Sequence, residues 1–189
     1  MRIIFLLLFP LALTAAGRPA ERPAVAKQGQ LAPQVVLKKI INGDITTMKG
    51  WEELKGKAVV MEFWATFCDP CVENIPHLNE LAAKFKDKPV IFLSVSKENE
   101  AAVRKFLKIH AMSGNVAAEA GAVFKSFNVF GTPRTVLIDK NSRVAAFSYP
   151  SSVTEATIEN LLAGKELKSD EPQRRKVLRA TAGPWSSLP

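Results

Sequence analysis

The sequence has few of the residues that bind metal ions or attach haem. Its 189 residues include two cysteines and two histidines. A structural zinc site takes four such ligands, but there is no second CxxC, and His77 lies six residues beyond Cys71 on a predicted helix, where we expect it to be exposed. Haem attachment needs a histidine directly after the second cysteine, where this chain has Val72. A copper carrier would lack an obvious third ligand. We therefore expect no metal and no cofactor.

The N-terminal hydrophobic run is too short to cross a membrane. Residues 3–13 are apolar, about half of the roughly 20 residues that a spanning helix needs. Arg2 precedes the run, and Thr14 and Ala16 can occupy the −3 and −1 positions of a cleavage site, so residues 1–16 are predicted to be a secretory signal peptide. We expect an exported, periplasmic or otherwise extracytoplasmic protein, with an uncleaved membrane anchor as the alternative.

The shortage of cysteine also limits what the CxxC can do. Exported proteins fold in an oxidising space where structural disulfides are common, yet Cys68 and Cys71 are separated by only two residues. A bridge that closes such a short loop restricts the unfolded chain very little and therefore adds little stability. The spacing favours a redox site over a structural disulfide.

Positive charge is in excess, with 26 Lys and Arg against 18 Asp and Glu and a net charge of +8. Residues 165–189 contain six of the basic and three of the acidic residues, including the run RRKVLR. Such a run can contact an anionic membrane surface or nucleic acid, or act only as a solvated tail. Export argues against nucleic acid. We expect residues 166–189 to be a basic, disordered tail and residues 17–30 to be a flexible linker.

The remaining segment, residues 31–165, has the hydrophobic patterns of one alternating α/β domain. Strands are predicted at 35–40, 45–48, 58–65, 89–95, 135–140 and 144–149. Helices are predicted from about Cys71 to Phe85 and at 98–111, 121–129 and 153–165, with a single helical turn at 51–54. Ile109 is expected on the inward face of its helix, and Thr154 at a helix N-cap. This order predicts a leading β-hairpin, a parallel core and an antiparallel edge.

The predicted elements place Cys68 beside the start of a helix. Strand 58–65 ends just before it, and a thiol at a helix N-terminus faces unpaired N–H groups and the positive end of the helix dipole. Both stabilise the thiolate, which is the form that attacks a disulfide. Cys71, one turn further, can then attack the mixed disulfide and release the product. We expect Cys68 to be the attacking cysteine and Cys71 the resolving cysteine.

The stretch WATFCDPC resembles the active site of the exported TlpA/ResA-like thiol-disulfide oxidoreductases, whose motif commonly reads W-A-x-W-C-x-P-C. The matching residues are Trp64, Ala65, Cys68, Pro70 and Cys71, and Phe67 stands where tryptophan is usual. The similarity covers about residues 31–165. It implies a thioredoxin-like three-layer α/β/α sandwich with a mixed sheet and an N-terminal β-hairpin extension, and a redox-active disulfide between the two cysteines.

The resemblance also implies roles for residues outside the motif. Glu62 matches the position of a buried acid that helps to deprotonate Cys71 as a general base, and burial should raise its pKa. A polar residue facing a water-filled gap is the alternative. Pro133 matches a proline that is cis in this fold, and the backbone of Thr132 is implied to pair with an incoming peptide strand. Pro76 matches a proline that kinks the helix.

The residues between and before the cysteines are expected to tune the redox potential. The charge of Asp69 should disfavour the thiolate and so weaken the stabilisation of the reduced form, which favours a reductant. Pro70 also favours a reductant by resemblance, and Trp64 is a third residue expected to tune the potential. We therefore expect a reductase of protein disulfides, and we expect it to be a monomer. The resemblance suggests cytochrome c maturation thiols as substrates and a DsbD-like membrane thiol reductase as the electron donor.

Two other functions are compatible with the same fold. Peroxiredoxins place their attacking cysteine three residues after a threonine, but Thr66 lies two residues before Cys68, and no second-site arginine is evident. A non-catalytic chaperone or metal carrier could use the fold as a binding platform. Peroxide consumption without a protein disulfide substrate would favour the peroxidase, and function retained after Cys68→Ser would favour the binding protein.

Overall fold

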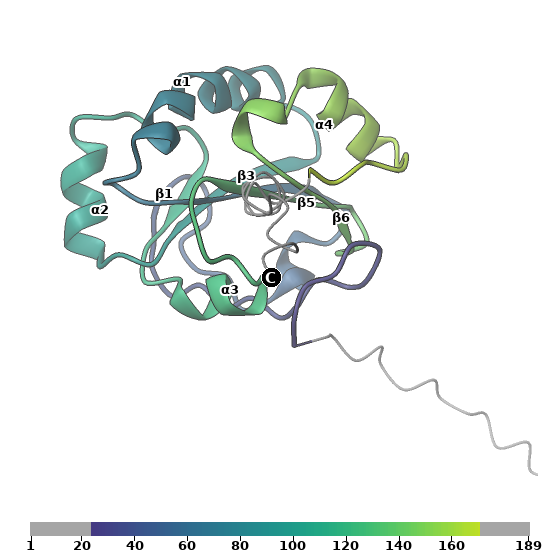
Figure 1. Ribbon diagram of the computed structural model, residues 1–189, viewed down its shortest axis with the longest axis horizontal. Coiled ribbons are helices and arrows are strands. Elements are labelled where there is room, and N and C mark those ends of the chain that lie inside the picture. The colour runs from purple at the N-terminus through teal and green to yellow at the C-terminus, as the bar shows by residue number, and fades with distance from the viewer. Residues whose placement is uncertain (1–23, 171–189) are drawn as a thin grey trace, which may run out of the picture.

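One six-stranded mixed sheet forms the centre of the molecule (Figure 1). The computed structural model describes residues 24–170. The strands are β1 (Ile40–Asn42), β2 (Ala58–Trp64), β3 (Val90–Ser96), β4 (Asn115–Ala117), β5 (Arg134–Ile138) and β6 (Val144–Ser148). The helices are α1 (Asp69–Lys84), α2 (Glu100–Leu107), α3 (Gly121–Ser126) and α4 (Glu155–Leu162), with the 3-10 turns η1 (Trp51–Leu54) and η2 (Pro150–Ser152). The order across the sheet is β1-β4-β3-β2-β5-β6.

The strand directions agree with the predicted pattern. β3 runs parallel to β2 and to β4, whereas β1, β5 and β6 pair antiparallel with their neighbours. This arrangement confirms the predicted α/β fold with a parallel core and an antiparallel edge. The sequence pattern does not predict β4, because its three buried residues, NVA, are too few to display a strand periodicity.

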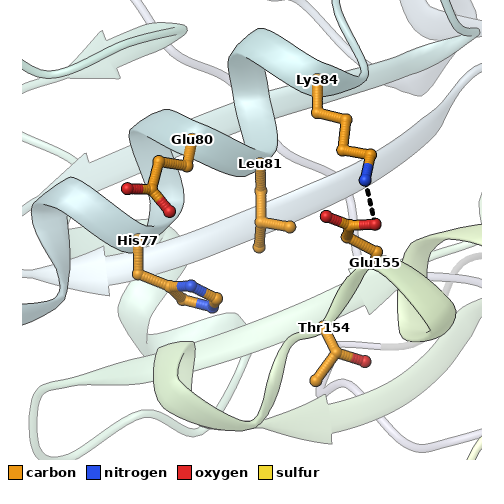
Figure 2. Close-up of a pocket in the computed structure, with 6 residues that line it drawn as sticks. All are labelled: His77, Glu80, Leu81, Lys84, Thr154 and Glu155. Atoms are coloured by element: carbon orange, nitrogen blue, oxygen red, sulfur yellow. Dashed lines mark hydrogen bonds and ion pairs between the residues drawn. The ribbon is translucent and has the colours of Figure 1, made fainter.

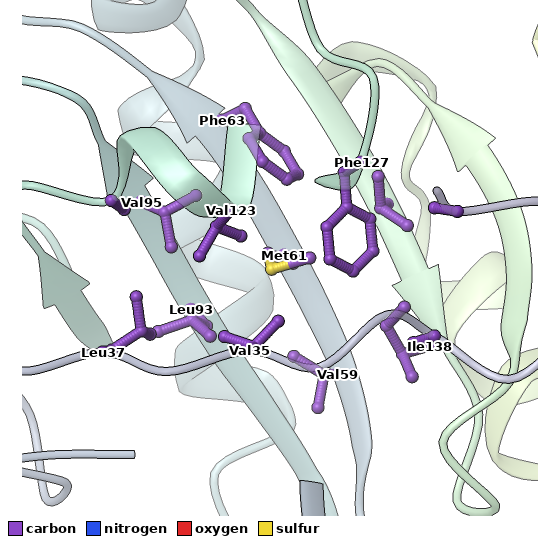
Figure 3. Packing of buried hydrophobic residues seen from close by; sticks show 14 of the residues in the cluster. Val35, Leu37, Val59, Met61, Phe63, Leu93, Val95, Val123, Phe127 and Ile138 are labelled. Carbon is purple, nitrogen blue, oxygen red and sulfur yellow. The ribbon is translucent and has the colours of Figure 1, made fainter. Parts of the chain in front are cut away.

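The central strand β2 is buried along its whole length and separates two apolar layers. Successive side chains of a strand point to opposite faces of the sheet. Val59, Met61 and Phe63 therefore pack on one face, together with residues of α3 and of the N-terminal segment (Figure 3). Ala58 and Val60 pack on the other face, with residues of α1 and α4. Figure 1 shows α1 and α4 over one face and α3 over the opposite one, which makes a three-layer sandwich.

The predicted N-terminal hairpin forms only in part. An antiparallel bridge between Leu37 and Met48 and a hydrogen bond from Ile40 N to Thr46 O (3.3 Å) join its two arms. The first arm ends in β1, which pairs with β4 at the edge of the sheet. The observed strand therefore begins only where the strand predicted at 35–40 ends, because β4 offers backbone partners that a short isolated hairpin lacks.

Helix α2 is shorter than its hydrophobic pattern predicts. It begins after Asn99, whose side chain accepts a hydrogen bond from Ala102 N (2.9 Å), and it ends at Leu107. Ile109, expected on the inward face, lies beyond the last turn and is 74% exposed. That prediction is wrong, because the helical periodicity no longer applies after the helix ends. In α1, by contrast, the helix continues through Pro76.

Both ends of the described region are hydrogen-bonded to β6. Gly29 N donates to Val144 O (2.8 Å), and Val144 N donates to Gln30 O (2.9 Å). Near the other end of the strand, Asp170 N donates to Phe147 O (2.7 Å). Residues before 31 and after 165, the predicted limits of the domain, are thus hydrogen-bonded to the sheet.

Several predictions concern residues beyond this region. The predicted signal peptide, residues 1–16, lies outside the described residues, as do residues 171–189 of the predicted basic tail and the first part of the predicted linker. Within residues 24–170, no helix has both the length and the apolar character needed to cross a membrane.

Candidate active site

The cysteine pair lies where β2 leads into α1. β2 ends at Trp64, a short loop follows, and Cys68 is the N-cap of the helix. The helix begins at Asp69, two residues earlier than predicted. Pro70 suits the first turn of a helix, because the N–H that proline lacks would have no helical partner there. Cys71 N donates to Cys68 O (2.9 Å) within this turn.

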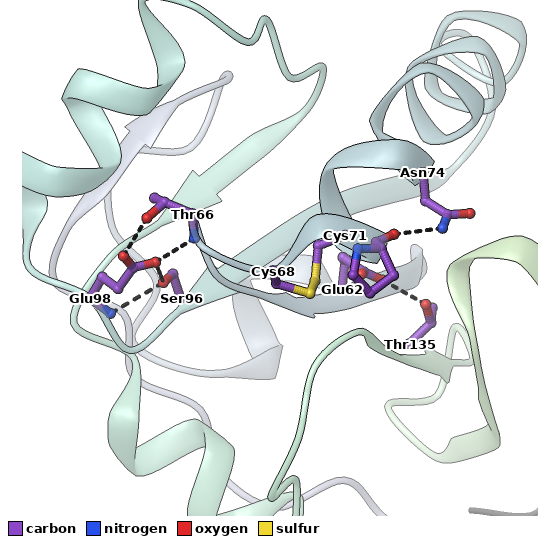
Figure 4. The surroundings of a disulfide bond; sticks show 9 residues. Glu62, Thr66, Cys68, Cys71, Asn74, Ser96, Glu98 and Thr135 are labelled. Atoms are coloured by element: carbon purple, nitrogen blue, oxygen red, sulfur yellow. Dashed lines mark hydrogen bonds between the residues drawn. A yellow bond between two sulfur atoms is a disulfide. The ribbon is translucent and has the colours of Figure 1, made fainter. Parts of the chain in front are cut away.

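Cys68 and Cys71 form a disulfide, with an S–S distance of 2.05 Å and Cα atoms 5.2 Å apart (Figure 4). Both cysteines are buried. The N-cap position places Cys68 at the positive end of the α1 dipole, which can stabilise a thiolate after reduction. Chemically, the arrangement suits a dithiol that is oxidised and reduced in turn.

Glu62 is buried in β2, on the face that α1 covers. Its Oε2 accepts a hydrogen bond from Thr135 Oγ1 (2.6 Å), and the two residues are directly opposite each other on β2 and β5. Burial raises the pKa of Glu62 from 4.5 to about 8, and the hydrogen bond from Thr135 opposes this change with a smaller effect. A carboxyl group with such a pKa can accept and return a proton near neutral pH.

The segment before β5 contains the predicted substrate-binding residues. The peptide bond between Thr132 and Pro133 is cis, as the resemblance implies, and both residues are half-buried. Two large apolar side chains in these segments are mostly exposed: Phe67, next to Cys68, at 79%, and Phe130, three residues before Pro133, at 80%. Exposed aromatic side chains are enriched at protein-binding surfaces. Phe67 stands out in the sequence because it lies in the WATFCDPC motif, whereas Phe130 belongs to no motif and cannot be recognised from the sequence.

The three residues predicted to tune the redox potential differ in their surroundings. Asp69 and Pro70 are exposed, whereas Trp64 is fully buried. Trp64 packs on Phe106 of α2, with ring centroids 5.1 Å apart, in the apolar cluster that also contains the two cysteines. Its Nε1 has no hydrogen-bond partner among residues 24–170. The apolar surroundings of the disulfide are therefore supplied by α2 as well as by α1.

Two polar contacts near the cysteine pair are not predicted by the sequence. Glu98, just after β3, accepts hydrogen bonds from the backbone and side chain of Thr66 (2.7 and 2.6 Å). Thr135 is the partner of Glu62. These partners are 32 and 73 residues apart along the chain. Such contacts have no local sequence signature, because only the pairing of the strands brings the residues together.

A hollow of about 290 Å³ lies between α1 and the start of α4 (Figure 2). Its lining residues are His77, Glu80, Leu81, Lys84, Thr154 and Glu155, and neither cysteine is among them. His77, predicted to be exposed, is half-buried, and its Nε2 lies 2.7 Å from Val153 O. That prediction is wrong, because the turn before α4 packs against α1. In the described region, no group of three or more His, Cys, Asp or Glu side chains is placed to hold a metal ion.

The fold and this site define a thioredoxin-like α/β protein with a CxxC disulfide at a helix N-terminus. Residues 27–162 match the family model described as Redoxin. The chain therefore belongs to the redoxin family.

Two curated relatives illustrate the similarity. The chain is 36% identical over 95 residues to the thiol-disulfide oxidoreductase ResA of Bacillus cereus, a stretch that covers 49% of this chain and 55% of that protein. It is 35% identical over 130 residues to ResA of Geobacillus kaustophilus, covering 66% of this chain and 70% of the relative. The match to the first relative thus spans only about half of that protein's length.

Solved structures show the same fold. The crystal structure described as a thiol:disulfide interchange protein DsbE from Chlorobium tepidum has a TM-score of 0.61 and 28% identity, and the match covers 73% of this chain and 97% of that one. A thioredoxin solution structure from Neisseria meningitidis has a TM-score of 0.56 and 22% identity, with 80% and 91% covered. At that identity the second structure supports the fold alone.

Proposed function

We propose that the protein is an exported thiol-disulfide oxidoreductase that reduces disulfides in protein substrates. The observation that carries the proposal is the Cys68–Cys71 disulfide at the N-cap of α1, because this position favours thiolate formation. The relatives named thiol-disulfide oxidoreductase ResA support the same chemistry. The exposed side chains of Phe67 and Phe130 favour a protein over a small thiol as the substrate.

The reaction starts from the reduced protein, with two thiols. The Cys68 thiolate attacks one sulfur of a substrate disulfide, the substrate S–S bond breaks, and the leaving sulfur takes up a proton. Glu62, in its ionised form, accepts the proton of Cys71. The Cys71 thiolate then attacks the Cys68 sulfur of the mixed disulfide, and the second substrate sulfur leaves and is protonated. Two electrons pass to the substrate, and the Cys68–Cys71 disulfide is formed.

A further dithiol must then reduce the protein again. We assign this role to a DsbD-like membrane thiol reductase, whose two thiols become a disulfide as Cys68 and Cys71 are reduced. Cytochrome c maturation thiols are the substrate class that the resemblance to ResA-like proteins favours. Export rests on the pattern of residues 1–16. We expect a monomer, because flanking chain segments bind β6 near both of its ends.

The direction of electron flow follows from the reduction potential. Because Asp69 adds negative charge beside Cys68, we expect a potential nearer to the value of about −270 mV for thioredoxin than to about −120 mV for the oxidant DsbA. Equilibration of the full-length protein with glutathione, followed by thiol alkylation and mass spectrometry, measures it. A potential close to that of DsbA would reject the reductase direction.

The substrate class can be tested by trapping. In Cys71→Ala the resolving thiol is missing, so we expect Cys68 to retain its partner as a mixed disulfide, which non-reducing electrophoresis and mass spectrometry would identify. Cys68→Ala is the matched control, and it should trap much less, because the proposed attacking thiol at the N-cap of α1 is then missing. Recovery of small-molecule adducts alone would argue against a protein substrate.

A further inference from the structure

Glu98 binds the loop that leads into the cysteine pair. Its Oε2 accepts hydrogen bonds from Thr66 N (2.7 Å) and Ser96 Oγ (3.1 Å), and its Oε1 accepts one from Thr66 Oγ1 (2.6 Å) (Figure 4). Ser96 Oγ in turn accepts a hydrogen bond from Glu98 N (3.2 Å). We call Thr66, Ser96 and Glu98 the Glu98 clamp. It joins the end of β3 to the loop, two residues before Cys68.

The carboxylate of Glu98 forms no ion pair with a basic side chain within residues 24–170. Glu100, two residues further on, differs, because it pairs with Arg104 (2.7 Å) and Lys39 (3.5 Å). Glu98 is half-buried, so solvent screens its formal charge less than that of a fully exposed carboxylate. The carboxylate is hydrogen-bonded to Thr66, whose Cα is at most about 7 Å from that of Cys68, so the charge lies on the order of 10 Å from the Cys68 sulfur. This separation is close to the Debye length of about 10 Å, and a half-buried charge is screened less over it than an exposed one.

Other charges near the pair are weaker or opposed. Asp69 is exposed, so its effect is screened by solvent. Glu62 has a pKa of about 8 and is mostly protonated at pH 7. The positive end of the α1 dipole acts in the opposite sense and stabilises a Cys68 thiolate. The carboxylate of Glu98, which contacts the active-site loop, is therefore less screened by solvent than that of Asp69.

We propose that Glu98 is a positioning residue for the dithiol: it holds the loop at Thr66, and its charge keeps the reduction potential of the Cys68–Cys71 couple low. This inference rests on the proposed dithiol chemistry. A negative charge near Cys68 disfavours the thiolate, which destabilises the reduced form and makes the disulfide harder to reduce. The Glu98 clamp thus favours the transfer of electrons from the dithiol to the substrate.

The substitution Glu98→Gln tests the effect of the charge, because it removes the charge and keeps the shape of the side chain. We expect the equilibrium of the full-length protein with glutathione to shift about three- to tenfold toward the reduced protein, tenfold being about 30 mV for this two-electron couple. Glu98→Asp keeps the charge and shortens the reach, so its equilibrium should stay within about twofold of wild type. Glu100→Gln is the distal control, because that carboxylate is already paired, and its equilibrium should not change.

Two outcomes would overturn the inference. One is a folded Glu98→Gln protein with the wild-type potential, and the other is an equal shift in Glu98→Asp, where the charge is kept. Thermal melting shows which variants fold. If Glu98→Gln does not fold, the inference still requires that the glutathione equilibrium of Glu98→Asp stays that of the wild type. The wild-type potential is a separate readout: a strongly oxidising wild type with a shifted Glu98→Gln would reject the reductase direction and retain the role of Glu98.

Discussion

At the scale of single residues, Glu62 links protonation to stability. Its pKa is about 8 in the folded protein, against an ordinary value of 4.5, because burial penalises the charged form. Below about pH 4.5 the carboxyl is protonated in both the folded and unfolded states, so its contribution to stability is fully present. As the pH rises the unfolded state loses the proton first, and the contribution is lost progressively until the folded pKa has been passed.

Glu62→Gln should therefore become more stable than wild type as the pH rises. Between pH 5 and pH 8 we expect the difference in the free energy of unfolding to grow by roughly 2–4 kcal/mol in favour of the variant. Urea denaturation of both proteins across this range measures it. The same variant should resolve the mixed disulfide more slowly, because Cys71 loses the general base that we propose for it. Stability curves that run parallel with pH would show that Glu62 does not titrate in this range.

The two acids near the disulfide differ in how far the sequence predicts them. Glu62 can be found because strand periodicity and its spacing from the CxxC are both local properties of the chain. Glu98 cannot, because its role depends on Thr66, 32 residues away, and on where β3 ends beside β2. Residue types alone would describe Glu98 as one more charge at the start of a helix.

At the scale of elements, caps define helix ends better than hydrophobic patterns do. Thr154 was recognisable as an N-cap, and its side chain accepts a hydrogen bond from Thr157 N while the Thr157 side chain accepts one from Thr154 N, which confirms the prediction. α1 begins two residues before its predicted start, because a cysteine is not a usual capping residue and does not mark the N-cap in the sequence. Strand β4 was missed because its position is set by pairing with β3 and β1 and not by its own three residues.

At the scale of the whole molecule, the segment that follows α4 returns to the sheet. Asp170 Oδ2 accepts hydrogen bonds from Ser148 Oγ (2.9 Å) and Tyr149 N (3.2 Å), and Asp170 O accepts one from Arg134 Nη2 (3.1 Å). Arg134 directly follows the cis proline, Pro133. The end of the described chain is thereby connected to the predicted substrate-binding segment.

Asp170→Ala should lower stability through the loss of its two side-chain hydrogen bonds. We expect a decrease of about 1–2 kcal/mol in the free energy of unfolding, measured by urea denaturation. Glu166→Ala is the matched control, because that acid is exposed, and it should change stability by less than about 0.5 kcal/mol. Equal effects of the two substitutions would mean that the contacts of Asp170 do not hold the segment in place.

The attachment of both chain segments to β6 also bears on solubility. An exposed strand edge can recruit the same strand from another copy, and successive additions build fibrous aggregates. Val144 is already bonded to Gly29 and Gln30, and Phe147 to Asp170, so a second molecule finds no continuous row of free N–H and C=O groups along this strand. In the proposed function the protein binds extended peptides of its substrates, and these contacts prevent the β6 edge of a second copy from binding in their place.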